Sequence, residues 1–454
     1  MAKVTASIPQ GTRDFGAETV RKRNYIFNTI RQVFEVYGFQ PLETPAMENL
    51  ETLQGKYGEE GDKLMFKILN NGLSDPKNID SVRRAFESVL TGKSDKDLTM
   101  RALKYDLTIP FARYVAMNHN QLTLPYKRYQ MQPVWRADRP QKGRYREFYQ
   151  CDADVVGSRS LINEIEFIHI YLTVFEKLGV NVELKINNRK ILTALSELCG
   201  GSAFLTAITV AIDKLDKIGI EKVKEELTAR NLSDEQVSTI EKYLSISGTN
   251  AEKITQAKDL LGSIPAATQG LEEIAYLLEA HSANDKIQVD FTLARGLNYY
   301  TGTIFEIKAN DVQMGSIGGG GRYDDLTGLF GVPNIPGVGI SFGVDRIYDV
   351  MEELKLFPED VHTGTKILFF NLGENESRSA FALMQMLRKK NIAAELFHEK
   401  AKFDKQFTYA EKKNIPYVVI IGESELKTET CLLKDIKTGE QKSLSMSALT
   451  EMVF

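Results

Sequence analysis

Residues 126–136 and 144–154 each alternate between two kinds of side chain. Strand side chains point alternately to two faces, so the alternation predicts a β-hairpin with Pro140 and Gly143 in its turn. One face is mostly apolar. The other carries guanidinium, amide and carboxylate groups, from Arg128, Gln130, Gln132, Arg136, Arg144, Arg146, Gln150, Asp152 and Asp154. A plain solvated face more often carries Lys, Glu and Thr, so this mixture indicates a functional surface, and Arg139 and Lys142 in the turn suit anion contact.

Elsewhere apolar residues recur at helical spacing, in the ranges 21–37, 106–117, 163–178 and 189–283. The last range, in which Ser233 and Gln236 fit a capping box, is interpreted as a helical insertion of one small domain. Residues 71–97 are polar and highly charged, and we interpret them as a surface insertion with a possible helix over 83–90.

Strand spacing resumes at residue 286, where one apolar face formed by alternate residues continues as far as Arg295. An arginine at the end of an apolar stripe needs a partner, because an unpaired buried charge is costly. A structural ion pair and an anion site are both open as explanations.

Short apolar runs at 367–370 and 418–421 are typical of buried parallel strands. A helix over 378–389 and a strand over 394–397 are predicted between them. This pattern indicates a small α/β domain over 365–454, after a linker that begins at Pro358.

Two glycine-rich segments are candidate ligand sites. The run from Gly315 to Gly321 matches neither nucleotide-binding fingerprint, so we expect a tight turn with close backbone approach, with ligand proximity as the alternative. The segment from Gly337 to Arg346 has the pattern of a strand that runs into a helix. Arg346 then falls near a helix start, where free N–H groups also attract anions.

Composition narrows the class of protein. A length of 454 residues predicts two to four domains, and 43% hydrophobic with 26% charged residues is ordinary for a folded soluble chain. No apolar run approaches the roughly 20 residues of a membrane span, and the N-terminus lacks a secretory signal. Three isolated cysteines suit a reducing cytoplasm, and five scattered histidines argue against a histidine-based metal site. The net charge of -4 gives no general nucleic-acid signal, although local patches could still bind one.

Several motifs together resemble class II aminoacyl-tRNA synthetases, and histidyl-tRNA synthetases in particular. The segments that carry the resemblance are Ile8–Asp14 (an N-terminal signature), 21–45 (motif 1), Tyr105–Thr108 (a histidine-binding loop), Arg136–Phe148 (motif 2), Leu293–Gly302 (a histidine-specific signature) and Gly339–Arg346 (motif 3). Motifs 2 and 3 alone would identify only the class, whereas the Arg-Gly…Tyr-Tyr-Thr-Gly segment indicates the amino acid.

The resemblance implies an α+β fold, in which an antiparallel catalytic sheet is flanked by helices. The catalytic domain would occupy 1–188 and 286–358, with the helical insertion at 189–285 and an α/β anticodon-binding domain at 365–454. It also implies a cytoplasmic homodimer without membrane attachment that serves protein biosynthesis.

The implied reaction has two steps: histidine and ATP form histidyl-adenylate, and the histidyl group then passes to tRNA(His). Mg²⁺ is the implied cofactor, although the sequence does not indicate its ligands. By resemblance, Arg136 and Arg295 are catalytic. Arg136 would contact the α-phosphate and the carboxylate region of histidine, and Arg295 would approach the α-phosphate from the other side. The ATP-binding residues would be Arg136, Arg144, Phe148 and Arg346.

The resemblance assigns histidine binding to Asp106, Leu107, Thr108, Arg136, Gln150, Asp154, Arg295, Tyr299 and Tyr300. Asp154 would accept the imidazole N–H and Tyr300 would face the other ring nitrogen, while Asp106, Thr108 and Gln150 would hold the α-ammonium group. Taken singly, Asp106 could be a helix cap and Asp154 a strand-end charge, and the tyrosine pair could belong to the core. Asn298 departs from the aspartate of many family members, which puts a charge role there in doubt.

The motif 2 loop, with Arg139, Gln141 and Lys142, is implied to contact the acceptor end of tRNA. Seven lysines between 389 and 413 could contact tRNA phosphates or simply keep the domain soluble. Alternatives to the synthetase are a non-catalytic, synthetase-like regulatory subunit of ATP phosphoribosyltransferase, a class II synthetase for another amino acid, and a pure RNA-binding module. The retained Arg136, Arg295 and Arg346 argue against the first and the last.

Overall fold

The computed structural model describes residues 5–54, 63–92, 95–281, 285–294, 299–362 and 364–454. The chain forms two compact units. The first contains residues 1–14 and 26–356, and the second contains residues 15–25 and 357–454. The division of the first unit into a two-part catalytic domain and a helical insertion stays a prediction.

An eight-stranded sheet in the order β1-β5-β6-β11-β10-β9-β7-β8 is the centre of the first unit. Its strands are β1 (Gln40–Pro41), β5 (Tyr126–Trp135), β6 (Glu147–Val156), β7 (Val182–Asn188), β8 (Ile287–Val289), β9 (Thr303–Ala309), β10 (Gly318–Tyr323) and β11 (Gly337–Gly343). All its pairs are antiparallel except β1 with β5 and β7 with β8. The predicted hairpin is confirmed, with Arg128 opposite Asp154 and Gln132 opposite Gln150. Its second strand begins at Glu147 rather than at residue 144, so Arg136, Arg144 and Arg146 lie in the connection and not in a strand.

Helices cover one face of this sheet. They include α1 (Ala17–Val36) and α6 (Ile162–Lys177), both expected from helical spacing, although α1 begins four residues before its predicted start. Phe34 of α1 and Tyr171 of α6 lie with ring centroids 5.8 and 4.8 Å from Phe342 on β11. Because neighbouring strand residues face opposite ways, Ser341 and Gly343 of β11 point to the other face, where the cavity described below lies. α13 (Val344–Glu353) follows β11, as the glycine-containing strand-to-helix pattern predicted.

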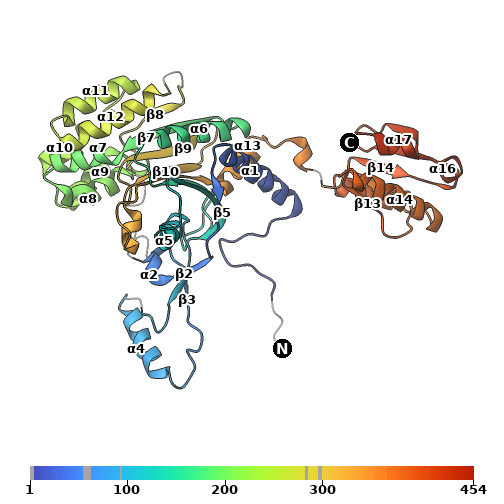
Figure 1. Cartoon of the computed structure of the whole chain (residues 1–454), viewed down its shortest axis with the longest axis horizontal. Helices are drawn as coiled ribbons and strands as arrows, with labels where there is room; N and C mark the ends of the chain where they lie inside the picture. The colour runs from blue at the N-terminus through green and yellow to red at the C-terminus, as the bar shows by residue number, and fades with distance from the viewer. Residues whose placement is uncertain (1–4, 55–62, 93–94, 282–284, 295–298, 363) are drawn as a thin grey trace. The chain divides into compact units, whose positions relative to one another are not determined.

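A helical layer follows β7 and lies beside β7 and β8 at one end of the sheet (Figure 1). Its helices are α7 (Arg189–Leu198), the short η1 (Ser202–Phe204), α8 (Leu205–Ile212), α9 (Leu215–Ala229), α10 (Asp234–Leu244), α11 (Asn250–Leu261) and α12 (Pro265–Glu279). The predicted capping box is present, since Ser233 accepts from the Gln236 amide and the Gln236 side chain accepts from the Ser233 amide.

A small three-stranded sheet and helix α4 project away from the large sheet (Figure 1). The strands are β2 (Met47–Asn49), β3 (Lys67–Ile68) and β4 (Arg101–Leu103), in the order β2-β4-β3. α4 (Ile79–Leu90) starts four residues before the predicted helix at 83–90 and exposes Phe86 and Leu90. The remaining elements of this unit are α2 (Leu50–Leu53), α5 (Thr108–Asn118) and η2 (Leu326–Phe330).

The second unit has a five-stranded sheet in the order β13-β12-β14-β15-β16. Its elements are η3 (Glu359–His362), β12 (Ile367–Phe369), α14 (Glu374–Lys389), β13 (Ala394–Leu396), α15 (Phe403–Lys412), β14 (Tyr417–Ile420), α16 (Glu423–Thr428), β15 (Thr430–Asp435), β16 (Gln441–Ser445) and α17 (Met446–Glu451). β12 pairs parallel with β13 and β14, which confirms the parallel strands inferred from the apolar runs. The antiparallel strands β15 and β16 complete the α/β fold.

Two local predictions are wrong. The strand predicted from residue 286 to Arg295 ends at Val289, because the Asp290 carboxylate accepts from the amide and hydroxyl of Thr292 and turns the chain. The glycine run is not a tight turn either, since Gly318–Gly321 lie in strand β10. A Cβ on Gly320 would lie 2.2 Å from the Gly339 carbonyl oxygen, so close backbone approach, the other half of that expectation, is present.

Among the helices that the structure describes, none is by itself long and apolar enough to cross a membrane. One pair bent by 117°, Arg189–Leu198 with Ser202–Ile212, reaches that length and composition only when its two parts are combined.

Candidate active site

A cavity of about 370 Å³ lies on the sheet face that the covering helices leave open. Strands β6, β10 and β11 form its floor, and the segments before α5, after β5 and before β9 form its walls. Charged side chains of both signs line it: Asp106, Arg136, Asp138, Arg144, Asp152, Asp154, Glu306, Asp345 and Arg346. The part of the polar hairpin face formed by Arg136, Arg144, Gln150, Asp152 and Asp154 therefore faces a cavity rather than open solvent.

The inner end of the cavity carries a buried ion pair. Arg128 is completely buried, and its Nη2 lies 2.8 Å from Oδ2 of Asp154. The Tyr323 hydroxyl donates a short hydrogen bond to the other oxygen of Asp154. Burial raises the pKa of Asp154, while the Arg128 charge and the Tyr323 hydroxyl act in the opposite direction. Arg128 therefore both fixes the carboxylate in place and favours its charged form.

Two tyrosines and the start of a helix complete this end. Tyr299 and Tyr300 line the cavity with ring centroids 4.9 Å apart, and burial raises the pKa of Tyr300, which keeps its hydroxyl protonated. Asp106 and Thr108 line it where α5 begins, and Asp106 Oδ1 accepts from the Ile109 amide at 3.3 Å. The helix-cap role considered for Asp106 is thus present together with its place in the cavity.

The outer end collects arginines around an aromatic ring. Arg136 Nε donates to the Tyr105 carbonyl oxygen at 2.9 Å, and its guanidinium carbon lies 5.2 Å from the Phe148 ring centroid. Arg346 donates to the carbonyl oxygens of Gly143 and Ser316 at 2.7 and 2.6 Å. These main-chain acceptors hold the two guanidinium groups in fixed positions. Such an arrangement suits a polyphosphate that lies beside a flat ring stacked on Phe148.

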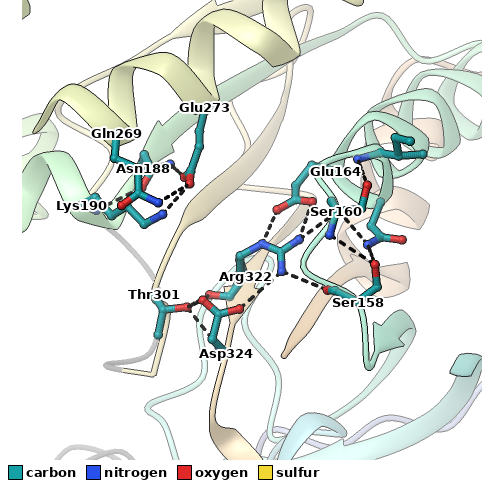
Figure 2. A network of polar contacts seen from close by, with 12 residues as sticks. Ser158, Ser160, Glu164, Asn188, Lys190, Gln269, Glu273, Thr301, Arg322 and Asp324 are labelled. Carbon is teal, nitrogen blue, oxygen red and sulfur yellow. Dashed lines mark hydrogen bonds and ion pairs between the residues drawn. The ribbon is translucent and has the colours of Figure 1, made fainter. Parts of the chain in front are cut away.

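A polar network around Arg322 includes Thr301, which directly follows the tyrosine pair (Figure 2). Arg322 of β10 is 4% exposed, and its Nε and Nη2 donate to the two carboxylate oxygens of the completely buried Glu164 at 2.6 and 2.7 Å. The Thr301 amide donates to the Arg322 carbonyl oxygen at 2.8 Å, and the Thr301 hydroxyl donates to Asp324. The tyrosine segment is therefore fixed to β10 through main chain and side chain.

A second part of the network joins the helical layer to β7. Asn188 Nδ2 donates to Glu273 at 2.6 Å, and Lys190 forms an ion pair with the same carboxylate (Figure 2). The Arg189 amide, between these two residues, donates to the Gly302 carbonyl oxygen at 2.8 Å. The helical layer thus holds the far end of the tyrosine segment.

Comparison with known proteins gives the family. The family model for histidyl-tRNA synthetase matches residues 82–347, which is more than half of the chain, and the anticodon-binding domain model matches residues 366–453. A histidine–tRNA ligase of Bacteroides fragilis is 50% identical and covers 97% of both chains. One from Christiangramia forsetii is 52% identical over 98% of both.

The chain belongs to the histidyl-tRNA synthetase family.

Solved structures agree with this. The crystal structure of histidyl-tRNA synthetase from Nostoc sp. has a TM-score of 0.82 and 31% identity, and the match covers 99% of each chain. A Bacillus halodurans structure titled as an ATP phosphoribosyltransferase regulatory subunit/histidyl-tRNA synthetase has a TM-score of 0.71 at 22% identity, which shows the shared fold alone. The expected α+β synthetase fold with a C-terminal α/β domain is confirmed.

Most residues that the family resemblance nominated lie around the one cavity. The described ones that line it are Asp106, Thr108, Arg136, Arg144, Phe148, Gln150, Asp154, Tyr299, Tyr300 and Arg346. Leu107 does not line it: its side chain is completely buried, and its carbonyl oxygen accepts from Arg128. Arg139, Gln141 and Lys142 are exposed in the loop between β5 and β6. Arg295 and Asn298 lie outside the described residues.

Sequence reasoning missed several residues of this histidyl-tRNA synthetase cavity. Asp152 and Arg128 stand on the polar hairpin face, so their alternation could have assigned both to the site. Tyr323 ends the glycine-rich strand β10, and Ser341 of β11 lies opposite Gly319 of that strand. No pattern in the sequence distinguished either residue from a core residue. Asp345 binds Arg13 and accepts from the Tyr149 amide, so the N-terminal signature reaches the cavity wall.

The described residues around this cavity do not form a preformed metal site. The described ranges contain no group of three or more His, Cys, Asp or Glu residues arranged to hold a metal ion. Mg²⁺ in nucleotide sites is usually bound through one or two carboxylates together with phosphate oxygens. Glu306 of strand β9 lines the cavity, is nearly buried and suits such a single protein ligand.

Proposed function

We propose that this chain activates L-histidine with ATP and transfers the histidyl group to the 3′ end of tRNA(His). One observation carries the proposal: the cavity joins a polar end with a fixed carboxylate and two tyrosines to an arginine-lined end with an aromatic ring. The names of the full-length relatives at about 50% identity support it, and they argue against a non-catalytic regulatory subunit. The retained anticodon-binding domain agrees with a tRNA substrate.

In the first step, a carboxylate oxygen of histidine attacks the α-phosphorus of ATP. The bond from that phosphorus to its bridging oxygen breaks, and pyrophosphate leaves. Negative charge grows on the α-phosphate oxygens, so fixed cations lower the barrier more than a strong base would. We assign Arg136 to the α-phosphate and the histidine carboxylate, Arg346 and Arg144 to the remaining phosphates, and Phe148 to the adenine ring.

Histidine selection follows from donors and acceptors. Neutral imidazole has one N–H donor and one acceptor nitrogen. We assign the N–H to Asp154, which Arg128 keeps as an acceptor, and the other nitrogen to the protonated Tyr300 hydroxyl. A side chain of similar size without these groups would leave both partners unpaired in a buried place, and such sites reject analogues strongly.

Mg²⁺ would arrive with ATP and neutralise phosphate charge, and Glu306 is our candidate ligand. In the second step, the terminal ribose hydroxyl of tRNA attacks the histidyl carbonyl carbon and releases AMP. We assign Arg139, Gln141 and Lys142 to the acceptor end of tRNA. We also propose that the protein is a cytoplasmic homodimer, and light scattering would test the oligomeric state.

Histidine-dependent exchange of pyrophosphate with ATP tests the proposed function. Exchange should require histidine, and no other amino acid should replace it. Exchange stimulated by proline, or independent of any amino acid, would contradict the proposal. Charging of tRNA(His), and not of another tRNA, tests the second step.

We further propose that Arg295 is a catalytic residue. Replacement by alanine should lower the exchange rate constant far more than it weakens histidine binding, because the lost charge acts on the transition state. Pre-steady-state adenylate formation, with histidine affinity measured separately, checks this. An equal loss in rate and affinity would make Arg295 a binding residue only.

A further inference from the structure

Three carboxylates meet at the inner end of the cavity, and one of them differs from the other two. Asp106, Asp152 and Asp154 are each 2–3% exposed. Asp154 is held by Arg128 and Tyr323, and Asp106 Oδ1 accepts a helix amide. Asp152 Oδ1 is buried and has no hydrogen-bond partner within the described part of the chain. Asp154 Oδ2 also lacks one there, but it lies 2.8 Å from Nη2 of Arg128. A buried acceptor of this kind is costly unless a ligand supplies the donor.

Asp152 is joined to a second such acceptor. Ser341 lies opposite Asp152 in the register of β6 and β11 and hydrogen bonds to its carboxylate. The same hydroxyl accepts from Gln150 Nε2 at 2.9 Å. This leaves Gln150 Oε1, which is likewise buried and unpartnered among residues that the structure describes. Two acceptors, two residues apart on one strand face, therefore border the cavity and share one hydroxyl that fixes both side chains.

The charges around Asp152 point to a cation. Its carboxylate faces Arg128 on β5, Asp154 on its own strand and Asp106 before α5. Arg128 already pairs with Asp154, so the three carboxylates exceed the guanidinium charge. Lys104 is within electrostatic range, but its Nζ donates to Thr44 and Gln132. The hydroxyls of Tyr171 and Tyr300 also face this carboxylate.

An amino acid substrate supplies one cation with three N–H donors, its α-ammonium group. We propose that Asp152 binds the α-ammonium of histidine through Oδ1, beside Oε1 of Gln150, with Ser341 as the positioning residue that orients both. This inference rests on the proposed function and extends the set of residues that select the substrate. It assigns the amino group to Asp152 and leaves the imidazole to Asp154.

The proposal has a pH consequence. Burial raises the pKa of Asp152 to about 7, and Asp154 and Asp106 raise it too, against the lowering effects of Arg128 and the Ser341 hydrogen bond. Below that pH the free site holds a neutral carboxyl that attracts an ammonium group less. The Michaelis constant for histidine should therefore rise as the pH falls from 8 to 6. Free imidazole also titrates near ~6.5, so the comparison requires a variant that lacks only the Asp152 ionisation.

The test uses the full-length protein with Asp152→Asn, which keeps the shape and removes the charge. Three compounds are measured in the pyrophosphate exchange assay: histidine as substrate, and histidinol and imidazolepropionate as competitors. Histidinol keeps the ammonium, and imidazolepropionate lacks it. We expect the Michaelis constant for histidine and the inhibition constant for histidinol to rise about 10- to 100-fold, as for a lost hydrogen bond to a charged group. The inhibition constant for imidazolepropionate and the Michaelis constant for ATP should stay within about twofold of the wild-type values. The Michaelis constant for histidine should depend less on pH than it does in the wild type.

Two results would overturn the inference. Equal weakening of imidazolepropionate would place Asp152 at the imidazole, and unchanged constants for all three compounds would leave it without a substrate contact. Should Asp152→Asn fail to fold, Ser341→Ala decides: a selective several-fold loss for histidine and histidinol supports the proposal, and no loss rejects it. Failure of the proposed function itself would be visible earlier, as wild-type exchange that does not depend on histidine.

Discussion

At the scale of single residues, the histidine end of the cavity depends on where one carboxylate stands. Asp154 contacts Arg128 and Tyr323 through its side chain, and the backbone of Gly339 borders it on the neighbouring strand. A Cβ at Gly339 would lie 2.0 Å from Asp154 Oδ1. The glycine therefore sets the room available to the carboxylate, and any larger residue must displace it.

Replacement of Gly339 by alanine tests this. The displaced carboxylate loses its aligned contact with the imidazole. The Michaelis constant for histidine in pyrophosphate exchange should therefore rise at least about tenfold, while the Michaelis constant for ATP stays within about twofold. Gly16→Ala is the matched control, because a Cβ there meets nothing within 4 Å. A variant with wild-type histidine affinity would show that Asp154 does not bind the imidazole.

At the scale of elements, the sheet supports the site through a buried ion pair that lies outside the cavity lining. Arg322 on β10 and Glu164 on α6 are bound through two short hydrogen bonds, and β10 in turn carries the Thr301 amide. A buried pair of this kind adds little over an apolar pair of equal size, but loss of one partner strands the other charge.

Arg322→Met should therefore lower the free energy of unfolding of the first unit by about 3–5 kcal/mol. The double variant Arg322→Met/Glu164→Leu removes both charges and should recover most of that loss. Urea unfolding followed by circular dichroism measures both. If the double variant is as unstable as the single one, packing rather than the stranded carboxylate explains the loss.

The elements differ in how well the sequence predicts them. The hairpin and its two faces were predictable because its side chains alternate in chemistry, whereas its register came from the structure. The glycine run was not, because a strand without side chains has no alternation to detect. The strand at 286 was predicted too long, since burial of Phe291 and Leu293 continues past the Asp290 turn and imitates an apolar strand face. The roles of site residues came from motif resemblance, and Asp152 was missed because no motif contained it.

At the scale of the whole molecule, the two units divide the proposed work, and the net charge of -4 leaves tRNA affinity to local patches. In the second unit Lys400, Lys402 and Lys405 are exposed. Lys390 and Lys413 instead bind the carboxylates of Glu451 and Glu395. The seven lysines considered from the sequence are therefore not equivalent.

Replacement of Lys400, Lys402 and Lys405 by glutamine should raise the tRNA Michaelis constant several-fold and reduce its salt dependence, because each phosphate contact contributes a slope of roughly 0.7–0.9. Histidine-dependent pyrophosphate exchange should be unchanged. The double variant Lys390→Gln/Lys413→Gln is the charge-matched control and should affect the tRNA constant less. If the control raises the tRNA Michaelis constant more than the triple variant does, Lys390 and Lys413 contact the tRNA instead.

The glycine strand has a consequence for inhibitors. Gly318, Gly319 and Gly320 offer main chain, not side chains, to the cavity floor. A compound that rests on this floor contacts atoms that every substitution retains. Resistance at that surface would require an added Cβ, and at Gly320 this atom would overlap the Gly339 carbonyl oxygen within the sheet itself. The floor is therefore the part of the cavity where escape mutations would most directly damage the protein that carries them.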